Sequence, residues 1–268
     1  MERLQEALQK AREKREGVPS QPMPVRSVQG SVPAAWEALK PFEPDLKLLE
    51  RNRIVATKAS KSSAPFDILR TKVLLNMRKN GWTRLALTSP TAACGKTTTA
   101  CNLALGFSRQ PDVRTCLFEF DLRRPSIARN LNLSLEHDIT EVLAGDVSFS
   151  EQALRYQGNV AVLAAKQAHA DPTAIMLQSQ THEVLEQIEK RYALDLAIFD
   201  LPPLLAGDET RAFLKEVDCA LMVALAETST TAQIDACERE MAEHCNVLGV
   251  VLNYCRLGDD GVQSYGSY

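Results

Sequence analysis

Short apolar segments alternate with amphipathic ones along most of the chain. Each apolar run is four to six residues long and rich in aliphatic and aromatic side chains, which is typical of strands buried on both faces. The apolar runs are Leu85–Thr88, Thr115–Phe120, Val160–Leu163, Leu196–Phe199, Ala220–Ala224 and Val247–Leu252. The segments with helical spacing are Thr97–Arg109, Ala174–Tyr192, Thr210–Val217 and Thr230–Glu243. This alternation predicts an α/β domain with a doubly wound, mostly parallel sheet in three layers, with helices on both faces.

The first fifty residues follow a different pattern. Residues 1–16 place apolar side chains at helical spacing among mixed charges, which predicts a short amphipathic helix. Residues 17–50 hold six of the thirteen prolines and are expected to form an extended linker. We therefore expect the α/β domain to span residues 51–256 and a flexible, tyrosine-containing tail to span residues 257–268.

Composition narrows the class of protein. A formal net charge of -3 offers no broad basic surface, so nucleic acid is not an expected partner. No apolar run is long enough to span a membrane, and no signal-peptide core follows Met1. The seven cysteines include no CxxC pair and are expected to be reduced thiols, mostly small core residues. These features favour a cytoplasmic protein.

The strongest chemical signal follows the first apolar run. A turn of small residues leads into Gly95-Lys96-Thr97 and then a helix. Backbone N–H groups at a helix N-terminus, together with the helix dipole, bind phosphate. Lys96 adds a charge for the β- and γ-phosphates, and the Thr97 hydroxyl can bind Mg²⁺. The pattern G-x-x-x-x-G-K-[ST] lacks its first glycine, where Pro90 stands, but the strand–turn–helix order indicates a P-loop NTPase.

Two later strands end in carboxylates. Glu119 and Asp121 close one apolar run two residues apart, which predicts that they share a face of the strand. Asp200 closes another run and precedes Leu201-Pro202-Pro203. Acidic groups at the carboxyl ends of parallel strands face the ligand crevice of a doubly wound sheet. Together with the phosphate loop, they predict a site for a nucleotide and a metal ion.

These motifs resemble the bacterial tyrosine kinases of exopolysaccharide and capsule synthesis. The likeness rests on the ordered segments TSPTAACGKTTTACNLA, FEFDLRRPS, AIFDLPPLL and VLGVVLNY, and it covers residues 52–255. It implies ATP and Mg²⁺ as cofactors, and regulation of polysaccharide chain length or export. It also implies a partner, the cytoplasmic segment of a membrane polysaccharide co-polymerase, which would recruit the chain to the inner face of the membrane.

The resemblance also implies residue roles. Either Asp121 or Glu119 would take the proton of the substrate tyrosine while Asp200 holds the hydration shell of Mg²⁺; in the alternative, Asp121 binds the metal. The implied catalytic residues are Lys96, Glu119, Asp121, Arg123 and Asp200, and the implied metal-binding residues are Thr97, Asp121 and Asp200. The implied nucleotide-binding residues are Ala92, Ala93, Cys94, Gly95, Lys96, Thr97, Thr98 and Asn253, the last beside adenine.

The chain departs from the family at three places. Glu119 stands where the family has aspartate, and Ala92-Ala93 stands where it has Pro-Gly. The oligomerising pattern E-x-x-R-x-x-R aligns with Ala64, Asp67 and Arg70, so that only the arginine remains. This predicts weak ring formation and leaves a homo-oligomer as an open alternative.

The tyrosines near the C-terminus are few. Tyr265 and Tyr268 lie on a Gly/Ser-rich segment that could reach a neighbouring site, which makes them the candidate phosphate acceptors. Tyr254 directly follows the last apolar run, so we expect it to be packed.

Three functions fit these observations. The first is an ATP-dependent tyrosine autokinase. The second is a weak P-loop ATPase or pseudokinase that regulates a co-polymerase through its nucleotide state. The third is a positioning or partitioning ATPase, which the missing lysine near the start of the loop, where Thr91 stands, disfavours.

Overall fold

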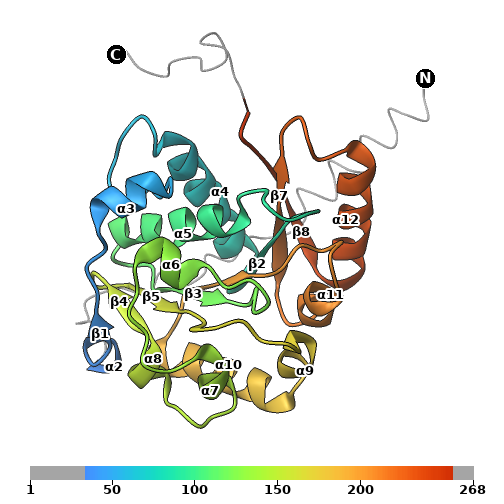
Figure 1. Ribbon diagram of the computed structural model, residues 1–268. Helices are drawn as coiled ribbons and strands as arrows, with labels where there is room; N and C mark the ends of the chain where they lie inside the picture. Colours follow the sequence, from blue (N-terminus) through green and yellow to red (C-terminus); the bar gives the residue numbers. More distant parts are fainter. Residues whose placement is uncertain (1–33, 256–268) are drawn as a thin grey trace, which may run out of the picture. The chain divides into compact units, whose positions relative to one another are not determined.

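Eight strands form one sheet in the part of the chain that the computed structural model describes, residues 34–255 (Figure 1). The strands are β1 (Lys40–Pro41), β2 (Arg84–Thr88), β3 (Thr115–Glu119), β4 (Leu154–Tyr156), β5 (Val160–Leu163), β6 (Leu196–Asp200), β7 (Cys219–Leu225) and β8 (Asn246–Asn253). Their order across the sheet is β1-β4-β5-β3-β6-β2-β7-β8. Every neighbouring pair is parallel except β4 and β5. The predicted doubly wound, mostly parallel sheet is therefore confirmed.

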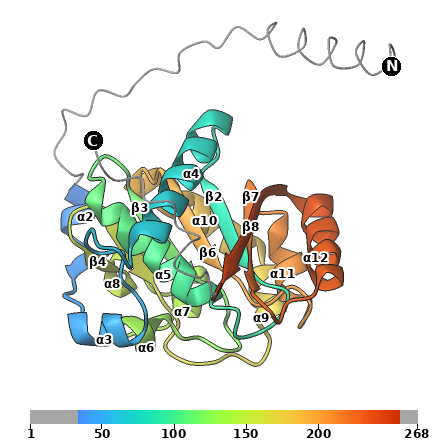
Figure 2. The ribbon, with the colours of Figure 1, turned by 90° about the horizontal axis from the view of Figure 1, so that it is seen from above.

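Helices cover both faces of this sheet, as the two views show (Figures 1 and 2). Side chains of α3 (Leu46–Arg51), α4 (Ala64–Asn80), α5 (Lys96–Gly106) and α6 (Ile127–Leu131) pack in one apolar core, and the 3-10 helix η1 (Phe107–Arg109) extends α5. The helices of the second core are α2 (Ala34–Glu37), α7 (Ile139–Leu143), α8 (Phe149–Gln152), α9 (Pro172–Met176), α10 (Ser179–Tyr192), α11 (Glu209–Leu214) and α12 (Thr231–His244). The result is the predicted arrangement of three layers.

The register of the central strands brings the predicted site residues to one edge. β3 pairs with β6 so that Glu119 lies opposite Asp200, and β2 pairs with β6 so that Leu87 lies opposite Asp200. The phosphate loop leaves the sheet immediately after β2. Because the three strands are parallel neighbours, their carboxyl ends place the loop beside both carboxylates.

Part of the predicted linker is folded. Trp36 in α2 is fully buried and donates from Nε1 to the carbonyl oxygen of Tyr192 at 2.7 Å. β1 pairs with β4, and Leu49 of α3 is buried in the first core. The expectation of an extended linker therefore does not hold for residues 34–50, because these apolar side chains dock on the domain. Residues 1–33, which include the predicted helix 1–16, lie outside the described residues.

The predicted helix over Ala174–Tyr192 is two helices, α9 and α10. Asp171 caps α9 by accepting from the N–H of Ala174 at 3.2 Å, with Pro172 in the first turn. The chain then breaks at Leu177 and Gln178 before α10 begins. Apolar periodicity continues across this break, which is why the sequence pattern indicated one element.

Two expectations from composition can be compared with this structure. All seven cysteines are free, and those described as buried are Cys94, Cys101, Cys116, Cys219 and Cys237, which confirms them as mostly small core residues. Among residues 34–255, the helices are all too short or too polar to cross a bilayer.

Candidate nucleotide-binding and catalytic site

The turn between β2 and α5 carries the predicted phosphate loop. Ala93 has a φ of 65° and Gly95, the N-cap of α5, has a φ of 84°. The left-handed conformation is unstrained for glycine but costs about 1–2 kcal/mol for an alanine, so the loop holds Ala93 in a strained conformation. α5 begins at Lys96, and the first-turn N–H groups of a helix have no partner within the helix. The loop therefore has the geometry of an anion site at a helix N-terminus.

Gly95 is also required by a close approach from β8. A Cβ atom at this position would lie 2.1 Å from Nδ2 of Asn253. Asn253 donates from Nδ2 to the carbonyl oxygen of Cys94 at 2.9 Å, and its Oδ1 accepts from the N–H of Tyr254 at 2.9 Å. Both polar ends of this amide therefore bond the backbone of the chain itself, and Asn253 ties the phosphate loop to the edge of the sheet.

Three predicted site residues meet in one buried ion cluster. Nζ of Lys96 lies 2.7 Å from Oδ1 of Asp200 and 3.4 Å from Oδ2 of Asp121. Burial lowers the pKa of Lys96, but the two carboxylates outweigh burial and raise it above its usual value. Burial raises the pKa of Asp121, and the charge of Lys96 opposes that shift. The loop lysine is thus held, charged, between two acids at the strand ends.

One oxygen of this cluster suits a metal ion. Oδ2 of Asp200 is buried and has no hydrogen-bond partner within the described part of the chain. An unpaired polar atom in the interior is costly, and a hydrated divalent cation would satisfy it. The Thr97 hydroxyl lies 3.5 Å from Nζ of Lys96 and provides a second hard oxygen. The residues present therefore fit Mg²⁺.

Glu119 is engaged elsewhere. It is fully buried, and its Oε1 accepts from the backbone N–H groups of Ser126 and Ile127, the latter at 2.7 Å. Its Oε2 accepts from the N–H of Ala165 at 3.0 Å. Burial raises the pKa of Glu119 to about 7, against the lowering effect of these N–H donors. The carboxyl group therefore binds the start of α6 to the loop after β5.

This burial predicts a pH-dependent contribution to stability. Below about pH 4.5 Glu119 is protonated in both the folded and the unfolded chain, whereas above about pH 7 the folded protein must hold a buried carboxylate. The parent therefore loses stability as pH rises between these values. Glutamine at position 119 does not titrate, so Glu119→Gln avoids this loss. The difference in the free energy of unfolding, Glu119→Gln minus parent, should therefore increase by roughly 3 kcal/mol between about pH 4.5 and about pH 7.

Urea unfolding of both proteins at about pH 4 and pH 8 measures this difference, because other titrating groups cancel between them. Glu183→Gln, an exposed exchange of the same kind on α10, should show no such change. If the difference in the free energy of unfolding between Glu119→Gln and the parent is the same at both pH values, the pKa of Glu119 is not raised.

Arg123 joins the loop after β3 to the segment after β6. Its Nε donates to Oε1 of Glu209, the buried first residue of α11, and its Nη1 donates to the carbonyl oxygen of Ala170 at 3.4 Å. A Cβ atom at Gly207 would lie 2.1 Å from Oε2 of Glu209, so a larger residue there would shift this carboxylate. No sequence pattern marked Glu209, because an acidic residue in a first helical turn is ordinary.

The residues aligned with the oligomerising pattern are used inside the domain. Arg70 is buried on α4 and donates to the carbonyl oxygen of Gly106 at 2.8 Å. Asp67 lies 2.6 Å from Nη1 of Arg109 and 3.1 Å from Nη1 of Arg70. Both side chains thus have partners within the domain, and weak ring formation stays a prediction.

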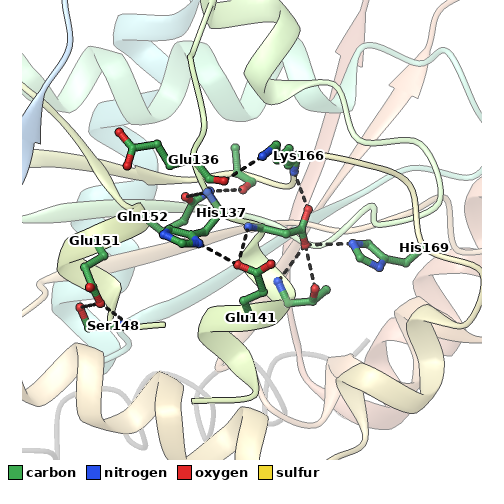
Figure 3. A network of polar contacts seen from close by, with 11 residues as sticks. Glu136, His137, Glu141, Ser148, Glu151, Gln152, Lys166 and His169 are labelled. Atoms are coloured by element: carbon green, nitrogen blue, oxygen red, sulfur yellow. Dashed lines mark hydrogen bonds and ion pairs between the residues drawn. The ribbon is translucent and has the colours of Figure 1, made fainter. Parts of the chain in front are cut away.

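A polar network that the sequence analysis missed holds the loop after β5. Figure 3 shows His137, Glu141, Lys166 and His169 around the start of α7. Asp138 lies at its centre. Its Oδ2 accepts from the N–H of Lys166 at 2.6 Å. Its Oδ1 accepts from the N–H and the hydroxyl of Thr140 and lies 2.9 Å from Nε2 of His169. The Asp-x-x-Glu capping box over 138–141 was the available signal.

This network ends next to the ion cluster. The N–H of His169 donates to the carbonyl oxygen of Leu122, one residue after Asp121, at 2.8 Å. Burial raises the pKa of Asp138, but the N–H and O–H donors outweigh burial and lower it. Asp138 is thus an ionised anchor that fixes the loop against the end of β3.

Replacing Asp138 by asparagine should destabilise the domain by about 2 kcal/mol at neutral pH. In the parent, backbone N–H groups donate to both oxygens of Asp138. Asparagine replaces one of these oxygens with an NH₂ group, which cannot accept, so the N–H donors on that side would be buried without an acceptor. Urea unfolding measures the change. Asp146→Asn, an exposed exchange nearby, should stay within about 0.5 kcal/mol of the parent. Equal effects of the two changes would contradict the role given to Asp138.

A loop lysine at a helix N-terminus, flanked by acids at the ends of neighbouring parallel strands, defines the class of P-loop NTPases. Within that class, the profile of the ParA family, described as "NUBPL iron-transfer P-loop NTPase", matches residues 83–262. The match covers more than half of the chain, and the chain belongs to the ParA family.

Several relatives carry the name of tyrosine kinase, and two of them differ in how much of their length is matched. Tyrosine-protein kinase etk of Escherichia coli K12 is 26% identical over 187 residues, which are 69% of this chain and 25% of the relative. Tyrosine-protein kinase YwqD of Bacillus subtilis is 27% identical over 225 residues, which are 82% of this chain and 92% of the relative. The chain thus spans a quarter of the first relative and nearly all of the second. The resemblance to bacterial tyrosine kinases is confirmed.

Solved structures agree on the fold. The kinase domain of Escherichia coli tyrosine kinase ETK has a TM-score of 0.67 at 24% identity, over 78% of this chain and 82% of that domain. Cobyrinic acid a,c-diamide synthase of Mycobacterium smegmatis, solved with bound ADP and magnesium, has a TM-score of 0.52 at 21% identity, over 64% of this chain and 74% of that one. The fold is therefore one that holds a nucleotide with magnesium in another protein.

Proposed function

We propose that the chain is an ATP-dependent protein-tyrosine kinase that modifies its own tyrosines. The observation that carries the proposal is the cluster of Lys96, Asp121 and Asp200 at the phosphate loop. Phosphoryl transfer needs charge neutralisation and in-line positioning more than covalent help, and this cluster supplies both a cation and acids at one place. The similarity to relatives named tyrosine kinases supports tyrosine as the acceptor.

Each residue of the cluster has a separate task. Lys96 would exchange its carboxylate partners for the β- and γ-phosphates of ATP, since a phosphate carries more negative charge than one carboxylate. Asp200 and Thr97 would hold Mg²⁺, which neutralises phosphate charge when bound. Asp121 would accept the proton of the tyrosine hydroxyl once Lys96 turns to the phosphates. The hydroxyl oxygen then bonds the γ-phosphorus, the bond to the bridging oxygen breaks, and ADP leaves.

The choice of Asp121 over Glu119 as the base follows from their surroundings. Glu119 is fully buried, and both of its oxygens accept from backbone N–H groups. Asp121 is 9% exposed and accepts from Lys96, which would leave it when phosphate binds. Arg123, paired with Glu209, would position the loop that carries Asp121.

We further propose Tyr265 and Tyr268 as acceptors and a membrane polysaccharide co-polymerase as partner. Both tyrosines lie outside the described residues, and their support is the resemblance to kinases of exopolysaccharide synthesis. Such a partner would place a cytoplasmic chain at the inner face of the membrane. The contacts of Asp67 and Arg70 within the domain favour a second candidate, a weakly active regulator gated by nucleotide.

Intact-mass and phosphopeptide analysis after incubation with Mg·ATP tests the proposal. The parent should gain one or two phosphates on the tail, and the double variant Tyr265→Phe/Tyr268→Phe should gain none there. Ser264→Ala/Ser267→Ala removes the neighbouring hydroxyls and should behave as the parent. Tight ATP binding with no phosphotyrosine would instead favour the regulator.

A further inference from the structure

A cavity of about 470 Å³ opens beside the phosphate loop. Its lining residues are Ala93, Leu225, Ala226, Glu227, Thr228 and Tyr254. They come from the phosphate loop, from the end of β7 and the connection that follows it, and from the residue after β8. The cavity thus lies at the carboxyl ends of the strands, next to the anion site, and its volume is in the range typical of small-molecule sites.

The aromatic ring of Tyr254 forms one wall of this cavity. Tyr254 was expected to be packed, but it is 50% exposed, because a φ of 59° turns it away from the line of β8. Its N–H is fixed by Oδ1 of Asn253. Its Cε2 would lie 3.4 Å from a Cβ atom at Gly95, so the ring stands against the phosphate loop.

An arginine from a distant segment supports the ring. The guanidinium carbon of Arg53 lies 4.8 Å from the ring centroid of Tyr254, a cation–π arrangement. Asn102, fully buried on α5, anchors this segment: its Nδ2 donates to the carbonyl oxygen of Arg53 at 2.8 Å, and its Oδ1 accepts from the N–H of Val55 at 2.8 Å. The same helix therefore carries the loop lysine and holds the arginine that orders the ring.

We propose that Tyr254 is the stacking platform for the base of the bound nucleotide, with Arg53 holding its ring in place. The inference rests on the proposed binding of ATP and names the residues that contact its base. A half-exposed aromatic ring offers the apolar, π-bearing face on which bases stack. Asn253, the residue expected beside adenine, has both amide ends bonded to backbone and contributes by holding the loop and Tyr254.

Binding measurements with two probes test the platform. Calorimetry with Mg·ATP should show that Tyr254→Ala weakens binding about tenfold or more, whereas Tyr254→Phe, which keeps the ring, stays within about threefold of the parent. Inorganic tripolyphosphate carries the phosphates without a base and should bind the parent and Tyr254→Ala equally. A purely structural role of Tyr254 would weaken both probes alike.

Arg53→Gln should weaken Mg·ATP binding about twofold to fivefold, through loss of the cation–π contact, and leave tripolyphosphate unchanged. Arg51→Gln, a nearby exposed arginine at the end of α3, is the matched control and should have no effect. Equal ATP affinity of Tyr254→Ala and the parent would overturn the platform while the proposed function stands. A parent that binds tripolyphosphate but not ATP would overturn both.

Discussion

Replacing Lys96 by methionine should reduce phosphate transfer about 100-fold or more. Removing one preorganised group that stabilises transition-state charge costs roughly 2.7–4 kcal/mol. The change also leaves Asp200 and Asp121 buried without their cation, and breaking a buried pair costs about 3–5 kcal/mol of stability. Transfer is measured by incorporation of labelled phosphate, and folding by circular dichroism of the same sample.

Two further variants keep this test interpretable. Lys96→Arg preserves the charge and the fold but changes the geometry of the cation, so transfer should fall at least about tenfold with stability close to the parent. Lys215→Met exchanges an exposed lysine at the end of α11 and should transfer phosphate as the parent does. Full activity of folded Lys96→Arg and Lys96→Met would show that Lys96 has no part in the reaction.

The second large effect is expected for Asp121→Asn. If Asp121 accepts the tyrosine proton, its loss should lower transfer by about 10² to 10⁴. Affinity for Mg·ATP should stay within a few-fold, because Lys96, Thr97 and Asp200, the groups proposed to hold the phosphates and Mg²⁺, are unchanged. Single-turnover transfer and calorimetric binding, measured on the same preparation, separate the two quantities.

Glu119→Gln is the matched comparison for the choice of base. It lies at the end of the same strand, and we expect it to retain most of the transfer activity, since Glu119 bonds only backbone N–H groups among its described hydrogen-bond partners. Asp235→Asn, an exposed exchange on α12, should have no effect. Active Asp121→Asn together with inactive Glu119→Gln would reverse the assignment.

The central strands were predictable because burial on both faces makes their sequences continuously apolar. The runs at 85–88 and 160–163 match β2 and β5 within one residue. β1 and β4 were missed because two or three residues give no periodicity to detect. The folded part of the predicted linker depends on Trp36 docking against Tyr192, a contact between residues 156 positions apart, which a local pattern does not show.

The site was predictable as a set of residues but not as a set of roles. Chain order alone placed Lys96, Asp121 and Asp200 at one edge of the sheet, and the structure brings them together. The expectation that Glu119 and Asp121 share a face stays a prediction, because β3 ends at Glu119 and strand alternation does not extend to Asp121. Their different partners arise from α6 and the loop after β5, which no motif marked.

A single turnover with ATP labelled on its γ-phosphate most directly decides whether the chain is a tyrosine kinase. The label is followed into two products, phosphotyrosine on the protein and free inorganic phosphate, in the parent and in Lys96→Arg. The proposal predicts label on tyrosine in the parent, formed faster than free phosphate and strongly reduced in the variant. Label that appears only as inorganic phosphate, or that stays on intact bound ATP, would refute kinase activity and leave a nucleotide-gated regulator.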